Sequence, residues 1–457
     1  MNTLSTTTKT KTFPKGGVHP KEFKFSAKNS IESIPLPKNV FVPLTQHLGA
    51  RAKPVVNPGD KVKVGQLIAE ADGFVSANIH SPVSGTVKNI DEVIDQTGYK
   101  QRAVIIETEG DEWLADIELS KNIKRDCNLS TQEISDKIFK AGIVGLGGAT
   151  FPTHVKLKIP PGKKLEHLII NGVECEPFLT SDHRLMLEKG EEIIIGIKIL
   201  MKVLNTDKAI IGIEVNKPDA INNLSDIASK YPGIEIHPLK VHYPQGGERQ
   251  LVRAITGKEV PPPPSGLPID VGCIIINVGT AFAVYEAVQK NKPLVERVVT
   301  VTGKSLKKPS NFLVRLGTTI SHIISVCGGL PSDTGKIISG GPMMGKALAS
   351  LDIPVTKGTS GIVIIPENEA KREEVSNCIR CGRCVEYCPL GLEPYLYMTL
   401  VERNMIDKAE EVKIHYCCEC GCCSYTCPAN RPLTDYIRLG KNIVLYNIKK
   451  RQTKKDG

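Results

Sequence analysis

The sequence has no apolar run that approaches the roughly 18 residues needed for a transmembrane helix. The best candidate spans residues 193–200, is short, and includes Lys198. The N-terminus also has no apolar signal core and is rich in threonine and lysine. These absences predict a chain with no membrane span and no secretion signal, which would reach a membrane only by docking onto membrane-embedded partners.

Aromatic residues are scarce, because Phe, Trp and Tyr together make up 5% of the 457 residues. This is a weak argument against surfaces that stack nucleobases. The net charge is +10, and part of the excess lies at the two ends of the chain. Solvated, disordered ends are the favoured interpretation, with attraction to an acidic protein or an anionic membrane leaflet as the alternative. Because no groove-reading motif accompanies the charge, we expect no nucleic-acid partner.

The 14 cysteines are clustered rather than spread, which indicates metal binding and not a secreted disulfide framework. Two runs follow the spacing C-x2-C-x2-C-x3-C-P, which is typical of bacterial ferredoxins with two 4Fe–4S clusters. In such ferredoxins the fourth cysteine of each run ligates the cluster of the other run. We therefore expect one cluster on Cys378, Cys381, Cys384 and Cys427, and a second on Cys417, Cys420, Cys423 and Cys388.

Structural zinc is the alternative for these cysteines, but zinc sites usually show CxxC pairs separated by a dozen or more residues, or mixtures with histidine. Cys418 and Cys422 lie inside the second run but off its spacing, and we interpret them as non-ligating neighbours of a cluster. A register in which either one replaces a ligand remains open. Because such clusters need reduced thiols during assembly, the sequence favours a cytoplasmic location.

The order of patterns along the chain predicts a multidomain protein of α/β and α+β domains. Short strands punctuated by Pro and Gly are expected over residues 40–110. The segment 57–67 resembles barrel-sandwich domains of the biotinyl/lipoyl type, and the hairpin region 70–79 has no lysine that could be modified. Strands alternating with helices then predict a mostly parallel sheet. The expected ranges are an arm (1–39), the barrel sandwich (40–115), an α/β domain (128–260), a β-grasp-like domain (261–366), a helical cysteine-rich domain (367–440) and a basic tail (441–457).

Two segments of the α/β domain have residues suited to ligand binding. Gly145, Gly147 and Gly148 follow a predicted helix, and glycines allow backbone N–H groups to approach a phosphate, with Lys156 adding a charge. An ordinary tight turn explains them equally well. The segment 171–177 follows a predicted strand and carries two glutamates that suit ribose hydroxyls or ring edges. A solvated acidic loop is the alternative for this second segment.

Taken together, these motifs resemble the C subunit of Rnf-type ion-translocating ferredoxin:NAD oxidoreductase complexes, in order and over nearly the whole chain. The α/β domain is similar to the flavin- and NADH-binding subunit of respiratory complex I. Residues 145–156 match its glycine loop, and residues 171–177 match its Asn-Ala-Asp-Glu-Ser-Glu-Pro segment. Two further matches lie at residues 247–249 and 276–280. The sequence departs from that subunit at Leu146, Val173 and Cys175, which replace Arg, Asp and Ser.

The resemblance implies a cofactor set and a site. FMN would be contacted by Gly145, Gly147, Gly148, Lys156, Asn171, Glu174, Glu248, Asn277 and Thr280. Phe151 and Glu176 would lie beside NAD(H), with Glu176 as the catalytic residue. The implied function is electron transfer between NAD(H) and two 4Fe–4S clusters through FMN, within a complex that couples ferredoxin oxidation to Na+ or H+ transport.

The implied partners are membrane subunits and a ferredoxin-oxidising iron–sulfur subunit, at the cytoplasmic face of the membrane. Two other functions remain open from the sequence. A cobalamin reductase-like enzyme would share the flavin-plus-cluster design, although the arm and barrel sandwich favour the Rnf-type subunit. A cluster-carrying scaffold with an inactive flavin site would explain the replacements at positions 146 and 173.

Overall fold

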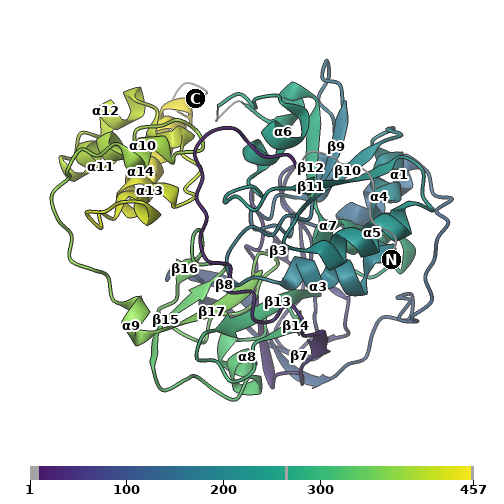
Figure 1. The fold of residues 1–457 in the computed structure, drawn as a ribbon. Helices are drawn as coiled ribbons and strands as arrows, with labels where there is room; N and C mark the ends of the chain where they lie inside the picture. The colour runs from purple at the N-terminus through teal and green to yellow at the C-terminus, as the bar shows by residue number, and fades with distance from the viewer. Residues whose placement is uncertain (1–9, 263–265, 454–457) are drawn as a thin grey trace.

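The computed structural model describes residues 10–262 and 266–453. The first nine residues of the arm, part of the proline-rich segment after residue 260 and the last four residues of the basic tail lie outside the described residues. Figure 1 shows a helical module, residues 372–453, set apart on one side of three β-containing domains. The N-terminal arm, drawn in purple, runs between this helical module and the teal α/β domain.

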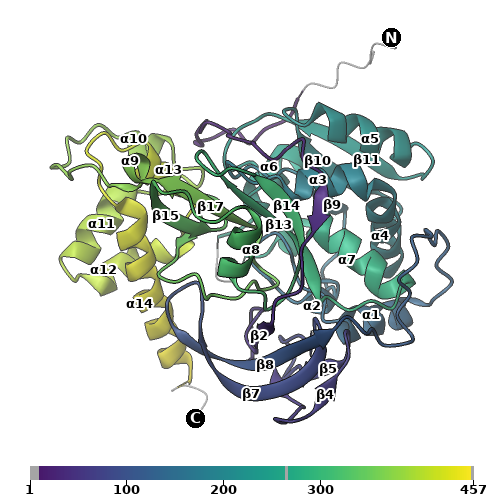
Figure 2. The same cartoon turned by 90° about the horizontal axis from the view of Figure 1, so that it is seen from below.

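Two small antiparallel sheets form the barrel sandwich, as the sequence predicts, and Figure 2 shows it below the other domains. The first sheet has the order β2 (Asn39–Pro43), β8 (Lys100–Gly110), β7 (Ser84–Ile94) and β4 (Lys61–Val62). The second has the order β3 (Lys53–Pro54), β5 (Leu67–Glu70) and β6 (Ile79–His80). Alternating apolar residues of both sheets, including Val40, Val42, Ile68 and Ile106, share one buried core.

A parallel sheet forms the centre of the α/β domain, in the order β11 (Ile234–Leu239), β10 (Ala209–Glu214), β9 (His167–Asn171) and β12 (Cys273–Asn277). Alternate residues of β9 pack on opposite faces, so both faces are buried under helices. One face carries α1 (Thr131–Lys140), α4 (Gly190–Val203), α5 (Pro218–Ala228) and α7 (Val278–Gln289), and the other carries α6 (Glu248–Thr256). A capping box formed by Ser130 and Glu133 begins α1.

The parallel sheet continues past residue 260, where the sequence places a domain boundary. β12 pairs with β9, and α7 packs against α4, so both belong to the α/β domain although they lie in the range 261–366. The 3-10 helix Pro268–Val271 precedes β12 and belongs to the same domain. The observed boundary differs from the expected one because the sheet to which β12 belongs is decided by its pairing with β9, which is distant in sequence.

The next domain is a six-stranded mixed sheet. Its order is β1 (Ile31–Ser33), β14 (Ser310–Arg315), β13 (Glu296–Gly303), β17 (Gly361–Pro366), β15 (Thr334–Ser339) and β16 (Lys346–Ala347). It is accompanied by α8 (Ile320–Val326) and α9 (Glu367–Ala370). The edge strand β1 comes from the N-terminal arm and pairs in parallel with β14, so the arm is an integral part of this sheet.

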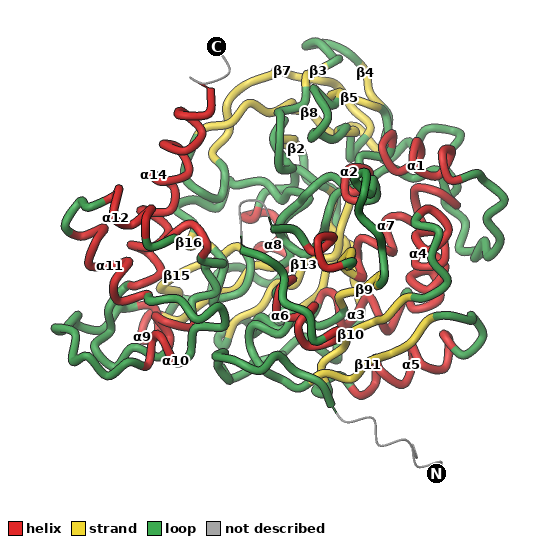
Figure 3. The backbone as a smooth tube through the Cα atoms, turned by 90° about the horizontal axis from the view of Figure 1, so that it is seen from above, coloured by secondary structure: helices red, strands yellow, loops and turns green. Residues whose placement is uncertain are grey.

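The helical module contains α10 (Arg383–Glu386), α11 (Pro394–Glu402), α12 (Ile406–Glu411), α13 (Cys422–Tyr425) and α14 (Leu433–Thr453). Figure 3 shows α11 and α12 in red beside the long α14, which continues through much of the range expected to be a solvated tail. The two cysteine runs fold alike, because Gly382 and Gly421 begin α10 and α13 with nearly equal positive φ values of 76° and 79°. Within the described residues, none of the helices is long and apolar enough to cross a membrane.

Candidate functional site

The glycine loop, residues 145–152, connects α1 to α2 (Thr153–Lys156). Its base is closed by hydrogen bonds from the Gly145 N–H to the Phe151 carbonyl (2.9 Å) and from the Thr153 N–H to the Ile143 carbonyl (3.0 Å). The tip at residues 147–149 is exposed, and Gly148 has a φ of +115° that disfavours other residues. The loop therefore presents backbone to solvent at the surface where the resemblance places a phosphate.

The glycine loop lies against the carboxyl end of β12. A Cβ added to Gly147 would lie 3.3 Å from the Cβ of Asn277, and the Leu146 N–H donates to Thr280 Oγ1 (2.9 Å). Asn277 also caps α7 and donates from Nδ2 to Asp182 Oδ2 (2.7 Å). The structure thus brings together two segments that the sequence assigns to one site, at the carboxyl edge of a parallel sheet where α/β proteins bind ligands.

The acidic motif, residues 171–177, is held in place by its own side chains. The Glu174 carboxylate accepts hydrogen bonds from the backbone N–H groups of Asp182 (2.7 Å) and His183 (3.1 Å), which begin α3 (Ser181–Glu188). Asn171 Nδ2 donates to the Gly246 carbonyl (2.9 Å). Both expected FMN contacts therefore have structural roles of their own, and the solvated-loop interpretation does not describe this segment.

Lys156 and Glu248, both expected at the FMN site, form an ion pair with 2.8 Å between Nζ and Oε1. Their side chains keep 30% and 42% of their accessible surface, so the pair lies at the solvent-exposed edge of the expected FMN site. An exposed pair of this kind contributes little to stability. An anionic ligand at the glycine loop can therefore recruit Lys156 at small cost.

Glu176 points toward a neighbouring domain. Its carboxylate accepts from the backbone N–H groups of Met343 (3.1 Å) and Met344 (2.9 Å) and lies 3.4 Å from the Tyr243 hydroxyl. Burial raises the pKa of Glu176 to about 7, against the lowering effect of those N–H donors. The structure thus engages this carboxylate in a contact between domains, and its role beside the nicotinamide stays a prediction, as does that of the half-buried Phe151.

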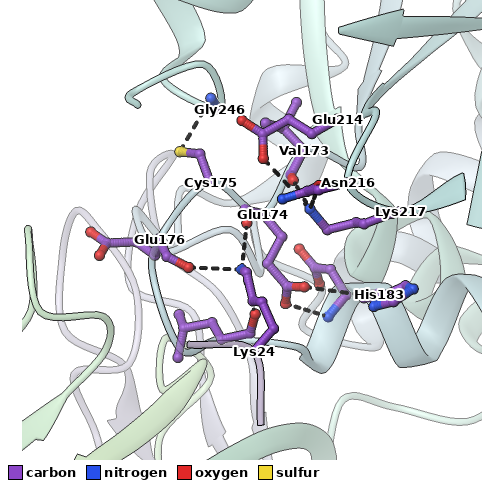
Figure 4. A network of polar contacts seen from close by, with 12 residues as sticks. Lys24, Val173, Glu174, Cys175, Glu176, His183, Glu214, Asn216, Lys217 and Gly246 are labelled. Atoms are coloured by element: carbon purple, nitrogen blue, oxygen red, sulfur yellow. Dashed lines mark hydrogen bonds and ion pairs between the residues drawn. The ribbon is translucent and has the colours of Figure 1, made fainter. Parts of the chain in front are cut away.

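A lysine from the arm fixes the acidic motif, and the sequence gives no local sign of it. Lys24 Nζ donates to the carbonyl oxygens of Glu174 (2.9 Å), Glu176 (2.9 Å) and Leu179 (2.7 Å). Figure 4 shows the ammonium group lying in the turn of this motif. Burial, and next the charge of Lys217, lowers the pKa of Lys24. The turn at Glu174, whose φ is +48°, therefore depends on a side chain about 150 residues away in sequence.

Arg297 brings a buried guanidinium group to the glycine loop from β13. Its Nη2 donates to the Leu146 carbonyl (3.4 Å) and its Nη1 to the Lys357 carbonyl. Burial lowers the pKa of Arg297 to about 10, while nearby Asp182 opposes the shift. Burial, followed by the charge of Glu174, raises the pKa of Asp182 to about 7. The complex I subunit has an Arg in this loop where the present chain has Leu146. The guanidinium group of Arg297, from the six-stranded domain, places a positive charge next to the same position.

The cysteine runs form two groups of neighbouring thiols. Burial raises the pKa of Cys384, and the nearby thiols of Cys427, Cys378 and Cys381 raise it further. The second group surrounds a cavity lined by Cys388, Cys417, Cys420 and Cys423, together with Cys418 and Cys422. Among the described residues, no three cysteine, histidine or carboxylate side chains converge closely enough to hold a single metal ion. The grouping nevertheless separates Cys384 from Cys388 in the way that crossed ligation requires.

The donor set of the second group suits an iron–sulfur cluster. The backbone N–H groups of Leu392 and Glu419 each lie 3.3 Å from a sulfur, that of Cys388 and that of Cys417 respectively. Hydrogen bonds to sulfur and apolar surroundings are features that set cluster potentials. Apolar residues, among them Leu390, Leu392 and Ile437, line the rest of this cavity.

Three family models match the chain. Residues 138–286 match the Nuo51 FMN-binding domain, residues 11–111 the RnfC barrel sandwich hybrid domain, and residues 298–347 the SLBB domain. These matches confirm the barrel sandwich and the flavoprotein-like domain, and they identify the six-stranded domain as an SLBB domain. The flavin-domain match extends past residue 260 and ends within α7, in agreement with the extent of the parallel sheet.

A solved structure has a similar fold. A chain of an NAD+-reducing [NiFe]-hydrogenase in the H2-reduced state aligns with a TM-score of 0.50 and 18% identity. The alignment covers 68% of this chain and 61% of the hydrogenase chain. At this identity the similarity concerns the fold alone.

The most informative matches are whole-length relatives. The C subunit of the "proton-translocating ferredoxin:NAD(+) oxidoreductase complex" of Clostridium ljungdahlii is 47% identical, covering 87% of this chain and 86% of that protein. The C subunit of the corresponding "Na(+)-translocating" complex of Acetobacterium woodii is 42% identical over 95% and 98% of the two chains. The C subunit of the "ion-translocating oxidoreductase complex" of Rhodobacter capsulatus is 40% identical over 96% and 84%. The chain therefore belongs to the family of C subunits of ion-translocating ferredoxin:NAD(+) oxidoreductase complexes.

Proposed function

We propose that this protein transfers electrons between NAD(H) and two 4Fe–4S clusters by way of FMN, as a peripheral subunit of an ion-translocating ferredoxin:NAD+ oxidoreductase complex. The observation that carries this proposal is the presence, in one chain, of an FMN-binding domain and two ferredoxin-type cysteine runs. The full-length similarity to C subunits supports the same function. We further propose that it docks on membrane subunits at the cytoplasmic face, beside a ferredoxin-oxidising iron–sulfur subunit.

Bound FMN would exchange a hydride with the nicotinamide and single electrons with the clusters. The chain supplies the binding groups. The exposed backbone of the glycine loop and the rim residue Lys156 would hold the phosphate, while Asn277 and Thr280 fix the loop against β12. Buried Arg297 and Asp182 add preorganised charge behind the loop. The acidic motif, fixed by Lys24, would present Glu174 and Asn171 to the flavin ring.

The cysteine groups would hold the two clusters in the crossed arrangement: Cys378, Cys381, Cys384 and Cys427 form the first set, and Cys388, Cys417, Cys420 and Cys423 the second set. The proximity of the Cys384 and Cys427 thiols supports this assignment. The position of Cys418 and Cys422 at the wall of the second cavity supports a role beside the cluster.

Anaerobic purification followed by iron, sulfide and flavin quantification tests the cofactor content. Stopped-flow measurement of flavin bleaching by NADH then tests the activity. Glu176→Gln should retain FMN, because the amide oxygen of Gln can still accept from the N–H groups of Met343 and Met344. It should slow the bleaching of the flavin by NADH, because the carboxylate charge is lost. A cluster-replete protein that binds FMN but is not bleached by NADH would favour the scaffold function.

The cobalamin reductase-like alternative is disfavoured by the N-terminal part of the chain. Residues 11–111 match a barrel sandwich hybrid described specifically for the C subunit, and this segment pairs with the α/β domain through the arm. A cobalamin substrate that reoxidises the reduced protein faster than an oxidised ferredoxin does would reverse this preference.

A further inference from the structure

The two cysteine sets differ in burial, and this difference bears on the path of electrons in the proposed function. In the first set Cys378 and Cys381 are exposed. In the second set Cys388, Cys420 and Cys423 keep only 7%, 7% and 8% of their accessible surface. The cavity of the second set is lined by the helical module itself, and residues of the α/β domain, the arm and the SLBB domain also contact this set or the residues next to it.

Tyr243 connects the α/β domain directly to the second cysteine run. Its side chain is 2% exposed, and its hydroxyl donates to the carbonyl oxygen of Cys420 (2.8 Å). The same hydroxyl lies 3.4 Å from Glu176 of the acidic motif. One buried phenol thus touches both the motif expected at the flavin and the backbone of an expected cluster ligand.

The arm is inserted beside this tyrosine. Val18 and Tyr243 exchange two backbone hydrogen bonds (2.8 and 2.9 Å), and the Gly17 N–H donates to the carbonyl of Tyr387 (3.0 Å), which precedes Cys388. A Cβ on Gly16 would lie 2.5 Å from the backbone of Cys388, so only glycine fits there. The arm therefore holds the two sides of the contact together.

The SLBB domain completes the contact through the loop 341–345. Glu176 accepts from the N–H groups of Met343 and Met344, and the Met344 carbonyl accepts from Arg438 of α14 (3.1 Å). A Cβ on Gly421 would approach the Met343 carbonyl at 2.8 Å. We call this meeting point the junction; its buried residues are Val18, Tyr243, Cys420 and Cys422.

We infer that Tyr243 is a positioning residue that holds the second cysteine set against the flavin domain, so that electrons pass between the flavin and the second set, and between the second set and the outward-facing first set. This inference rests on the proposed function. With the cofactors bound, NADH would pass its two electrons as one hydride to FMN, and the proton of that hydride would leave when the flavin is reoxidised. The two electrons would then pass singly through the second set to the first. Tyr243 itself gains and loses neither an electron nor a proton.

The hydrogen bond from Tyr243 gives the inference a measurable consequence. Groups that donate to the surroundings of a metal ligand tune its potential, and their removal typically lowers activity by about 10- to 100-fold. Tyr243→Phe keeps the packing of the junction and removes only the hydroxyl. We expect the midpoint potential of one cluster to shift, the other to stay unchanged, and the reduction of the clusters by NADH to slow by about tenfold.

The experiment uses the full-length, anaerobically purified protein with both clusters and FMN, followed by EPR-monitored redox titration and stopped-flow spectroscopy. Tyr231→Phe is the matched control, because its hydroxyl contacts Glu191 (3.0 Å), on the opposite side of the sheet from α6. FMN content should be equal in both variants. Equal potentials and equal cluster reduction in Tyr243→Phe and the control would overturn the inference.

Ligand variants test the order of the sets independently. In Cys378→Ser the remaining cluster should still be reduced by NADH at the parental rate, because the second set lies nearer the flavin. In Cys388→Ser the remaining cluster should be reduced at least about tenfold more slowly, in keeping with the effect of a lost intermediate site. The opposite pattern would reverse the order. If the parent protein shows no bleaching by NADH, the proposed function fails, whichever order holds.

Discussion

Lys24→Met is the substitution that most directly tests the link between the arm and the acidic motif. The ammonium group donates to three carbonyl oxygens at 2.9, 2.9 and 2.7 Å. Hydrogen bonds to charged groups contribute about 1.5–3 kcal/mol each, which would sum to roughly 4–9 kcal/mol. The lowered pKa of Lys24 shows that burial of the charge opposes this gain, and such a penalty amounts to several kcal/mol.

The expected net loss is about 2–4 kcal/mol in the free energy of unfolding of the α/β domain. Methionine fills the space of the stem, and water can reach the freed carbonyls from a cavity that Lys24 itself lines. Because Glu174 and Glu176 lose their common anchor, FMN retention should also fall. Denaturant unfolding followed by flavin fluorescence measures both effects.

Lys21→Met is the control, since Lys21 lies on the same arm and is exposed. The control should unfold within about 0.5 kcal/mol of the parent, as surface substitutions usually do. If Lys24→Met were as stable as this control and kept its FMN, the three hydrogen bonds would not be what fixes the acidic motif.

Three further outcomes are expected. Cys384→Ser and Cys427→Ser should abolish the same EPR signal and Cys388→Ser a different one; loss of a common signal in the Cys384 and Cys388 variants would refute crossed ligation. Gly147→Val should lose FMN, because an added Cβ would lie only 3.3 Å from the Cβ of Asn277 at the end of β12; flavin quantification after gel filtration decides this. Burial lowers the pKa of Lys357 to about 7, so between pH 7 and about 10 the unfolded chain binds more protons and this lysine makes stability rise with pH. Lys357→Met should remove that rise, which is at most about 5 kcal/mol, and unchanged unfolding profiles at about pH 7, 8 and 9 would contradict the shift.

The sequence predicts well those elements that are specified by neighbouring residues. The apolar segments at 168–171 and 209–214 become β9 and β10, because buried parallel strands are continuous apolar runs. The apolar periodicity over residues 188–204 is typical of a helix, and α4, Gly190–Val203, has its apolar stripe facing the sheet. The glycine loop and Asn277 meet as the resemblance implies, since both lie at the carboxyl edge of one sheet.

The sequence fails where a residue acts at long range. Nothing near Lys24 or Arg297 indicates that each reaches a loop about 150 residues away. The same reason explains the strand β1, whose partner β14 is distant in sequence, since Ile31 pairs with Asn311. The expected tail at 441–457 is largely helix because α14 packs on α11 and α12, which its basic composition does not show.

The arm is synthesised before every segment that it contacts and is among the last segments that can reach a final position. Asn311 donates to the carbonyl of Ser26, 285 residues earlier. The Gly17 N–H donates to the carbonyl of Tyr387, which is still more distant in sequence. Such distant contacts form late, because the cost of closing the intervening chain must be met first. Until the cysteine runs have folded, residues 10–24 lack part of the surface on which they dock. Protease sensitivity of this segment would therefore report on cluster assembly at the opposite end of the chain.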